Sequence, residues 1–416
     1  MRFESLGQHV RLSQGLAVNK GNASLFSDVQ TDEFPYPLLR IVDFGNEKQE
    51  DFSKYVSKDV SKTVIIDEET IVFTRVTCEC FRGYKGVLHN NLFAVEIYSS
   101  DIIEDYLYTV LQSEFVKKQA TNLTSSSVVP DLSHEMFKSI VIPIPEIAVQ
   151  KKIAETYLLL TEKIQINKKI NREMDLLVRS LYEYYFVQFD YPDINGKPYK
   201  SSGGAMIWNQ ELKREIPEGW NVYRLAECLD CNKNSMGKNN VLEEIQYLDT
   251  SNLTENRLDN IYRITNEEGY PSRAKRIVKE NDILFSTVRP EQKHFGILKK
   301  VVPNMVASTG YAVLSSNISC KYNDLFYLFL TSDININVLN TIANSSVSSY
   351  PSINSDDILN LKMALPNEMS CLDDIMDGFS DIHMKIFLLQ KENKELSSVR
   401  DYLLPMLLIG QLDFGE

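Results

Sequence analysis

The 416-residue chain has few cysteines and no long apolar run. A membrane-spanning helix needs about 20 consecutive, predominantly apolar residues, and no such stretch occurs. The residues that follow Met1 do not lead into the apolar core of a signal peptide. Six cysteines fit a reducing compartment. We therefore expect a cytoplasmic protein that makes no contact with membranes.

The chain also has no excess of basic residues over acidic ones. The chain has 44 Lys and Arg residues against 57 Asp and Glu residues, which gives a formal net charge of −13. An acidic protein binds DNA only if its basic residues cluster on one face or if a partner protein supplies the positive surface. The second half does gather basic residues, namely Arg273, Lys275, Arg276, Lys279, Arg289, Lys293, His294, Lys299 and Lys300. Such a run is also typical of an ordinary solvated surface.

Motifs for metal binding or catalysis are scarce. Cys228 and Cys231 resemble half of a zinc site, but no second pair completes a set of four ligands. Asp193 with Glu211 and Lys213 imitates the carboxylate and lysine pattern of metal-dependent nucleases, without a strand framework to hold it. No phosphate-binding loop or glycine-rich nucleotide turn occurs. We expect no metal, no cofactor and no catalytic residue in this chain; a nuclease at Asp193 and Glu211 is the catalytic alternative.

The most informative positive feature is an internal repeat. Ile153–Tyr185 aligns with Ile375–Leu407, and both copies place apolar residues at alternating steps of four and three. This 3.5-residue period, sustained for about four heptads, predicts two long helices that pair as a coiled coil. Asn171 and Asn393 occupy the same seam position, where a polar residue commonly fixes register. The predicted seam consists of Ile153, Tyr157, Leu160, Ile164, Asn171, Met174, Leu181, Ile375, Phe379, Ile382, Ile386, Leu389, Asn393, Leu396 and Leu403.

The segments before these helices also repeat. Each contains short β-like runs, then an amphipathic helix, near Ile102–Lys118 in the first and Asp324–Thr331 in the second, then a serine-rich loop. The predicted fold is α+β with two α+β units. Pro405 lacks an N–H donor, so we expect the second long helix to bend or end near Leu404. The predicted domains are a first unit (1–147), its helix (148–190), a linker with hairpin potential (191–219), a second unit (220–367) and a C-terminal helix (368–416).

Several of these segments support a named resemblance. The helix ending LVRSLYEYYFVQFDYP, the linker NGKPYKSSGG with IPEGW, and the terminal VRDYLLPMLLIGQLDF resemble type I restriction-modification specificity subunits over essentially the whole chain. The resemblance implies two target-recognition domains and an antiparallel coiled coil that separates them. It implies a non-catalytic chain whose partners are double-stranded DNA, two methyltransferase subunits and restriction motor-nuclease subunits. Those partners would bring S-adenosylmethionine, ATP and Mg.

Helix length and the resemblance together predict the kind of target. A helix of about 35 residues is roughly 50 Å long, so two units joined by it would contact two separated stretches of duplex. We expect a bipartite, asymmetric target with an unread spacer set by the coiled coil. A scaffold that joins two protein-binding modules without touching DNA is the alternative, and the negative net charge favours it slightly.

Candidate base-reading residues follow from chemistry, because cationic, amide and hydroxyl side chains suit base edges. Hydroxyl and cationic residues follow aligned apolar runs at Phe73-Thr74-Arg75 and Phe285-Ser286-Thr287. Each candidate is equally compatible with an ordinary structural role. In the first unit the candidates are Lys20, Thr74, Arg75, Arg82, Lys85, Ser125, Ser126 and Ser127; in the second they are Lys238, Ser286, Thr287, Arg289, Lys293, Ser346, Ser348 and Tyr350.

Overall fold

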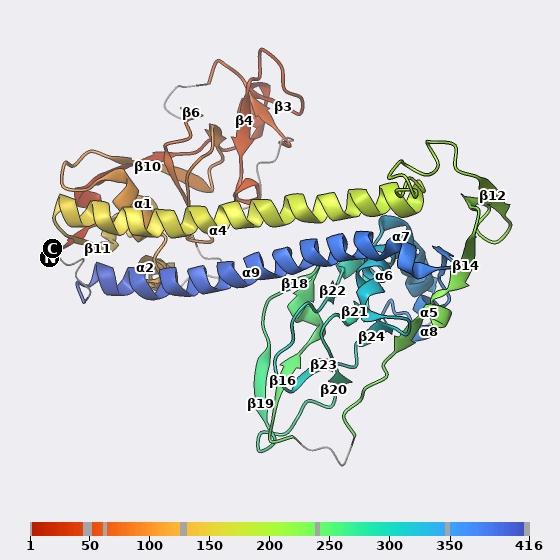
Figure 1. Ribbon diagram of the computed structural model, residues 1–416. Helices are drawn as coiled ribbons and strands as arrows, with labels where there is room; N and C mark the ends of the chain where they lie inside the picture. The colour runs from red at the N-terminus through yellow and green to blue at the C-terminus, as the bar shows by residue number, and fades with distance from the viewer. Residues whose placement is uncertain are drawn as a thin grey trace. The chain divides into compact units, whose positions relative to one another are not determined.

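The structure is a computed structural model that describes residues 2–44, 52–60, 65–124, 131–237, 242–345 and 350–411 (Figure 1). The chain forms two compact units. Unit 1 contains residues 1–165 and 393–416, and unit 2 contains residues 166–392. Each unit therefore takes one half of both long helices.

The globular part of unit 1 combines two sheets with three short helices. One sheet has the order β2 (Val10–Gln14), β10 (Leu92–Ile97), β7 (Ile71–Thr74), β8 (Cys80–Phe81). The other has the order β3 (Phe26–Ser27), β5 (Tyr55–Val56), β4 (Tyr36–Leu39), β9 (Gly86–Leu88), β6 (Ile65–Ile66). A third pair joins β1 (Arg2–Ser5) to β11 (Val141–Ile144). The helices are α1 (Glu104–Leu111), α2 (Glu114–Thr124) and α3 (His134–Ser139), with 3-10 turns η1 (Leu6–Gln8), η2 (Lys20–Leu25) and η3 (Ile41–Asp43).

Unit 2 is built in the same way. One sheet has the order β15 (Leu229–Cys231), β24 (Tyr311–Ser316), β21 (Ile283–Ser286), β22 (Phe295–Ile297), and another the order β19 (Tyr262–Thr265), β16 (Glu244–Leu248), β23 (Met305–Ser308), β20 (Ala274–Ile277). Pairs join β14 (Trp220–Arg224) to β25 (Lys362–Pro366), β17 (Leu253–Thr254) to β18 (Arg257–Leu258), and β12 (Met206–Asn209) to β13 (Arg214–Pro217). The helices are α5 (Leu225–Cys228), α6 (Asn323–Leu330), α7 (Asp333–Ser345) and α8 (Ser355–Leu359), with 3-10 turns η6 (Thr250–Asn252), η7 (Pro290–Gln292), η8 (Cys320–Tyr322) and η9 (Met369–Leu372).

The two units confirm the predicted α+β repeat, most closely in one four-stranded sheet; the second sheet has five strands in unit 1 and four in unit 2. The order β2-β10-β7-β8 in unit 1 matches β15-β24-β21-β22 in unit 2. Each unit also contains one parallel pair, β4 with β9 in the first and β16 with β23 in the second. The central strands β7 and β21 are buried along their whole length, as expected for four-residue runs that are apolar at three positions and covered on both faces. The hairpin β12–β13 confirms the hairpin potential of the linker.

The long helices are α4 (Ile147–Tyr182), extended by the π-helical turn η5 (Glu183–Val187), and α9 (Asp373–Leu408). In unit 1, Ile153 and Tyr157 of α4 share one apolar core with Leu404 and Leu407 of α9. The start of α4 therefore packs against the end of α9.

In unit 2 the opposite ends meet. Val178 and Tyr182 of α4 share a core with Met376 and Phe379 of α9, and the two helix segments lie side by side (Figure 1). The pairing is thus antiparallel. All 15 predicted seam residues are buried or half-buried. One polar contact between the helices joins Asn167 Nδ2 to Glu392 Oε2 at 2.7 Å.

Two sequence expectations about helices need correction. We expected the second long helix to bend or end near Leu404; the predicted end is wrong, since α9 continues through Pro405 to Leu408. Leu404, Leu407 and Leu408 are buried, and packing of this last turn outweighs the one backbone hydrogen bond that Pro405 cannot donate. The single helix expected near residues 102–118 is divided into α1 and α2. Ser113 Oγ accepts a hydrogen bond from Val116 N at 3.3 Å and starts a new helix.

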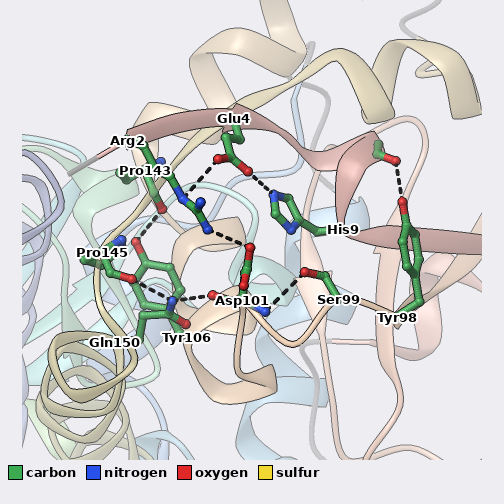
Figure 2. Close-up of polar contacts among 11 residues, drawn as sticks. Arg2, Glu4, His9, Tyr98, Ser99, Asp101, Tyr106, Pro143, Pro145 and Gln150 are labelled. Carbon is green, nitrogen blue, oxygen red and sulfur yellow. Dashed lines mark hydrogen bonds and ion pairs between the residues drawn. The ribbon is translucent and has the colours of Figure 1, made fainter.

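Hydrogen bonds attach the first turn of α4 to the rest of unit 1 (Figure 2). Gln150 is fully buried; its Nε2 donates to the carbonyl oxygens of Asp101 (2.7 Å) and Pro145 (2.9 Å), and its Oε1 accepts from Ile103 N at 3.0 Å. The Tyr106 hydroxyl donates to Pro143 O at 2.8 Å. The three bonds of Gln150 therefore tie the first turn of α4 to Asp101, Ile103 and Pro145.

In unit 2 a buried charged group attaches α9 instead. Lys299 Nζ lies 2.9 Å from Asp324 Oδ2 and 3.0 Å from Ser380 Oγ, and His383 Nδ1 lies 2.6 Å from Asp324 Oδ1. Burial alone would raise the pKa of Asp324, but the hydrogen bond and charge of His383 and the charge of Lys299 bring it below its ordinary value. Lys299 is therefore a core residue and does not contribute to the basic surface expected from the sequence.

Candidate nucleic-acid interface

Arg75 and Thr287 occupy the same position in the two units, directly after the central strands β7 and β21. Arg75 N donates to Asn91 O at 3.0 Å, and Thr287 N donates to Gly310 O at 2.9 Å. The carbonyl of Arg75 accepts from Leu132 N and that of Thr287 from Ile353 N, both at 2.9 Å. The alignment of Phe73-Thr74-Arg75 with Phe285-Ser286-Thr287 is therefore also a structural equivalence.

In unit 1 the candidates nearest this position are held by other side chains. Thr74 is fully buried, and its hydroxyl lies 2.7 Å from the Thr77 hydroxyl and accepts from Glu79 N at 2.8 Å. Arg75 donates from Nε and Nη2 to the two carboxylate oxygens of Asp131, at 2.9 and 2.8 Å. Thr74 stabilises the turn, and the charge of Arg75 is neutralised by a bidentate pair.

The other unit 1 candidates divide into one paired residue and two exposed ones. Arg82 Nη1 lies 2.5 Å from Asp105 Oδ1, and its guanidinium lies 4.7 Å from the ring centroid of Tyr108. Burial raises the pKa of Tyr108, so the ring stays neutral beneath the cation. Lys20 and Lys85 are exposed, and within the described part of the chain neither forms an ion pair.

In unit 2 the hydroxyl candidates also have backbone partners. Ser286 is buried and donates from Oγ to Val288 O at 2.9 Å, while Thr287 Oγ1 donates to Gly310 O at 3.1 Å. Lys293 Nζ lies 2.8 Å from Glu255 Oε1. These three side chains therefore stabilise the loop after β21.

Arg289 and Tyr350 differ from the other unit 2 candidates because they lie against each other. The guanidinium of Arg289 is 5.2 Å from the centroid of the Tyr350 ring, and Tyr350 is 61% exposed. The structure brings these two together although 61 residues of sequence separate them. The candidates Ser125, Ser126, Ser127, Lys238, Ser346 and Ser348 lie outside the described residues.

Sequence reasoning missed a cavity of about 560 Å³ in unit 2, between α4, the β17–β18 turn and the start of α7. Its cations are Arg172, Arg179, Arg257 and Lys293, and its acids are Asp175, Glu183, Glu255 and Asp333. Arg179 Nε donates to Asp175 Oδ2 at 2.8 Å, so part of this charge is already compensated. Only the tertiary fold brings these distant segments together, so no local motif could have predicted the cavity.

The residues singled out for metal chemistry have ordinary surroundings. Asp193 Oδ1 accepts from the backbone N–H groups of Asn195 (2.8 Å) and Lys197 (2.9 Å), and Glu211 pairs with Lys362 at 2.8 Å. Across the described ranges, no group of three or more His, Cys, Asp or Glu residues is placed to hold a metal ion. No helix among those ranges combines the length and apolar character needed to cross a membrane.

Comparison with known proteins gives consistent matches over both repeats. The family model for the type I restriction modification DNA specificity domain matches residues 8–175 and 217–398. The chain is 25% identical over 355 residues to the type I restriction enzyme MjaIX specificity subunit of Methanocaldococcus jannaschii, covering 80% of this chain and 76% of that protein. It is 22% identical over 385 residues to the MjaVIII specificity subunit of the same organism, covering 86% and 83%.

A solved structure agrees at the level of the fold. The S subunit of the type I restriction-modification system from M. genitalium superimposes with a TM-score of 0.62 at 13% identity, over 100% of this chain and 96% of that one. Since the family model covers most of the chain and matches each of the two repeated units, the chain belongs to the type I restriction-modification DNA specificity family.

Proposed function

We propose that this chain reads a bipartite, asymmetric DNA sequence and directs methyltransferase and restriction subunits to it. The observation that carries the proposal is the repeat: two units share one strand order but present different side chains at the equivalent positions Arg75 and Thr287. A shared fold with different polar residues suits two readers of different half-sites. Each long helix has 36 residues, or about 54 Å at 1.5 Å per residue, and we propose that this length sets the unread spacer.

Family membership and the outer faces of the helices support the proposed partner subunits. Besides the buried seam, both helices carry exposed apolar residues at heptad-like spacing, namely Leu159, Ile166, Ile170 and Leu177 on α4 and Leu388, Val399 and Tyr402 on α9. A second apolar stripe is typical of a helix that packs against a further helix. We propose that helices of two methyltransferase subunits dock on these stripes.

The chemistry then belongs to the partners, and this chain is non-catalytic. Methyltransferase subunits would use S-adenosylmethionine, and restriction subunits would use ATP and Mg, in the cytoplasm where the DNA lies. The net charge of −13 fits this division, because the partners can supply the positive surface that holds the phosphates. The isolated chain should therefore bind its target weakly and gain affinity with its methyltransferase partner.

An exchange experiment tests the modular proposal. Residues 1–147 are replaced by those of another family member, and methylated adenines are mapped across the genome of a host that carries the complete system. Only one half-site of the methylation motif should change. If neither half-site changes, the unit does not read DNA. A mobility shift with the methyltransferase present tests the scaffold alternative, which predicts no sequence-dependent shift.

A further inference from the structure

The loop after the central strand differs between the two units in length and in what it presents. In unit 1, β7 and β8 are joined by residues 75–79; in unit 2, β21 and β22 are joined by residues 287–294. The longer loop folds into the 3-10 turn η7 and contains Arg289. Unit 2 therefore carries an added, structured element at the position where unit 1 has a short turn.

Backbone conformation and hydrogen bonds fix the main chain at Arg289. Arg289 and Lys293 both adopt left-handed conformations, with φ of 47° and 55°, on either side of η7. Arg289 N donates to Pro351 O, Gln292 N to Arg289 O and Lys293 N to Pro290 O, each at 2.9 Å. Non-glycine residues in this region are uncommon and persist only where their surroundings impose them. The loop is thus fixed at both ends and by a hydrogen bond to Pro351 in the segment between α7 and α8.

The Arg289 side chain is also prearranged, but not by a carboxylate. Its guanidinium lies over the ring of Tyr350, and among the described residues it forms no ion pair. By contrast, Arg75, Arg82 and Lys293 are each paired with an acid. A cation–π contact with an aromatic face leaves the guanidinium N–H groups unoccupied by a carboxylate, so they can donate to a ligand.

We propose that Arg289, oriented by Tyr350, reads a guanine in the half-site recognised by unit 2. This rests on the proposed function. A planar guanidinium donates two parallel hydrogen bonds to O6 and N7 of guanine in the major groove, and no other base offers that pair of acceptors there. The contact with the Tyr350 ring restrains the guanidinium, so less conformational freedom is lost on binding. Tyr350 acts as the positioning residue.

The test uses the complete restriction-modification system with only this chain altered. Methylated adenines are mapped genome-wide for the wild type and for Arg289→Ala, Arg289→Lys and Tyr350→Ala. The matched control is Arg224→Ala, which removes an exposed arginine paired with Glu227 elsewhere in unit 2. In Arg289→Ala, preference for guanine at one position of the unit 2 half-site should fall roughly tenfold to hundredfold while every other position stays unchanged. Tyr350→Ala should weaken the same position less, and Arg224→Ala should leave the motif intact.

The remaining outcomes distinguish a failure of guanine reading by Arg289 from a failure of the proposed function. An unchanged motif in Arg289→Ala, or a relaxed position that is not guanine, would overturn guanine reading. A partial loss of methylation that is equal at every site would assign Arg289 to a phosphate and would also overturn it. If Arg289→Ala abolishes methylation altogether, Arg289→Lys decides: it must keep the motif with the guanine position weakened, and an unchanged motif there overturns the inference. A wild-type system that methylates no bipartite motif would instead overturn the proposed function.

Discussion

The two units share a strand order but are fastened to the long helices by different chemistry. Unit 1 holds the start of α4 through neutral hydrogen bonds of Gln150, whereas unit 2 holds α9 through the buried charges of Lys299 and Asp324. The helices α1 and α6 correspond, and Asp105 and Asp324 are both the second residue of their helix. Asp324 is buried, yet Asp105 forms an exposed pair with Arg82. Equivalent carboxylates thus have different roles in the two halves.

This contrast shows which features the repeat preserves. The apolar strands and the helix seam correspond in both units, because their burial determines the fold. The polar residues around them differ, including the loop that carries Arg289 in unit 2 and the turn that carries Arg75 in unit 1. The two units thus share a framework and differ in their polar residues, which suits the proposed pair of readers for different half-sites.

The largest expected effect comes from breaking the buried charged group of unit 2. Lys299→Met leaves the carboxylate of Asp324 without its lysine in a buried site, and we expect a loss of about 3–5 kcal/mol in free energy of unfolding. Urea unfolding followed by tryptophan fluorescence measures it, because Trp208 and Trp220 both lie in unit 2. The control is Lys300→Met, whose exposed pair with Glu280 should contribute less than about 1 kcal/mol. Equal losses in free energy of unfolding for Lys299→Met and Lys300→Met would contradict the expected difference between buried and exposed ion pairs.

A second effect concerns the seam that both units share. Ile164→Ala removes a buried side chain of α4, and we expect a loss of about 2–4 kcal/mol from the apolar area and the cavity left behind. Ile166→Ala removes the same side chain from the exposed face of the same helix and should change stability by less than about 0.5 kcal/mol. Thermal unfolding of the two variants makes the comparison. Under the proposed function, Ile166→Ala should instead weaken methyltransferase binding, measured by co-purification.

The parts of the fold that depend on burial could be predicted from the sequence, and the parts that depend on single polar contacts could not. The heptad spacing predicted the two long paired helices, and the repeat predicted the two α+β units. The break at Ser113 was missed because one hydroxyl decides it, and the helical turn beyond Pro405 was missed because tertiary packing overrides a local rule.

The candidate site shows the same limit more strongly. Arg75 and Arg289 were both candidates because of their residue type. Only the fold places Asp131 beside Arg75 and Tyr350 beside Arg289. Lys299 appeared to belong to a basic surface because nothing in its local sequence indicates that Asp324 and His383 surround it. Whether a charged residue is available for a ligand depends on tertiary partners, which a linear pattern does not contain.

Acid should weaken unit 2 through the same group. The pKa of Asp324 is lowered in the folded state, so its contribution to stability is present above the unfolded value of about 3.9 and is lost as pH falls through the lower folded pKa. Tryptophan fluorescence of urea unfolding between about pH 5 and pH 2.5 follows this loss. The double variant Lys299→Met with Asp324→Leu removes the titrating carboxylate and should show a shallower fall. An identical pH dependence in the double variant would assign the acid sensitivity elsewhere.

The smallest expected effect is in unit 1, at the carboxylate equivalent to Asp324. Arg82→Ala breaks the pair with Asp105, whose side chain is 53% exposed, so solvent screens most of the attraction. We expect a loss of about 0.5 kcal/mol, to which the contact of Arg82 with the Tyr108 ring adds on the order of another 0.5 kcal/mol. Thermal unfolding of this variant beside Lys299→Met compares the two corresponding aspartates directly. A loss from Arg82→Ala as large as that from Lys299→Met would mean that both units depend on their ion pairs alike, and the asymmetry between exposed and buried charge would not hold.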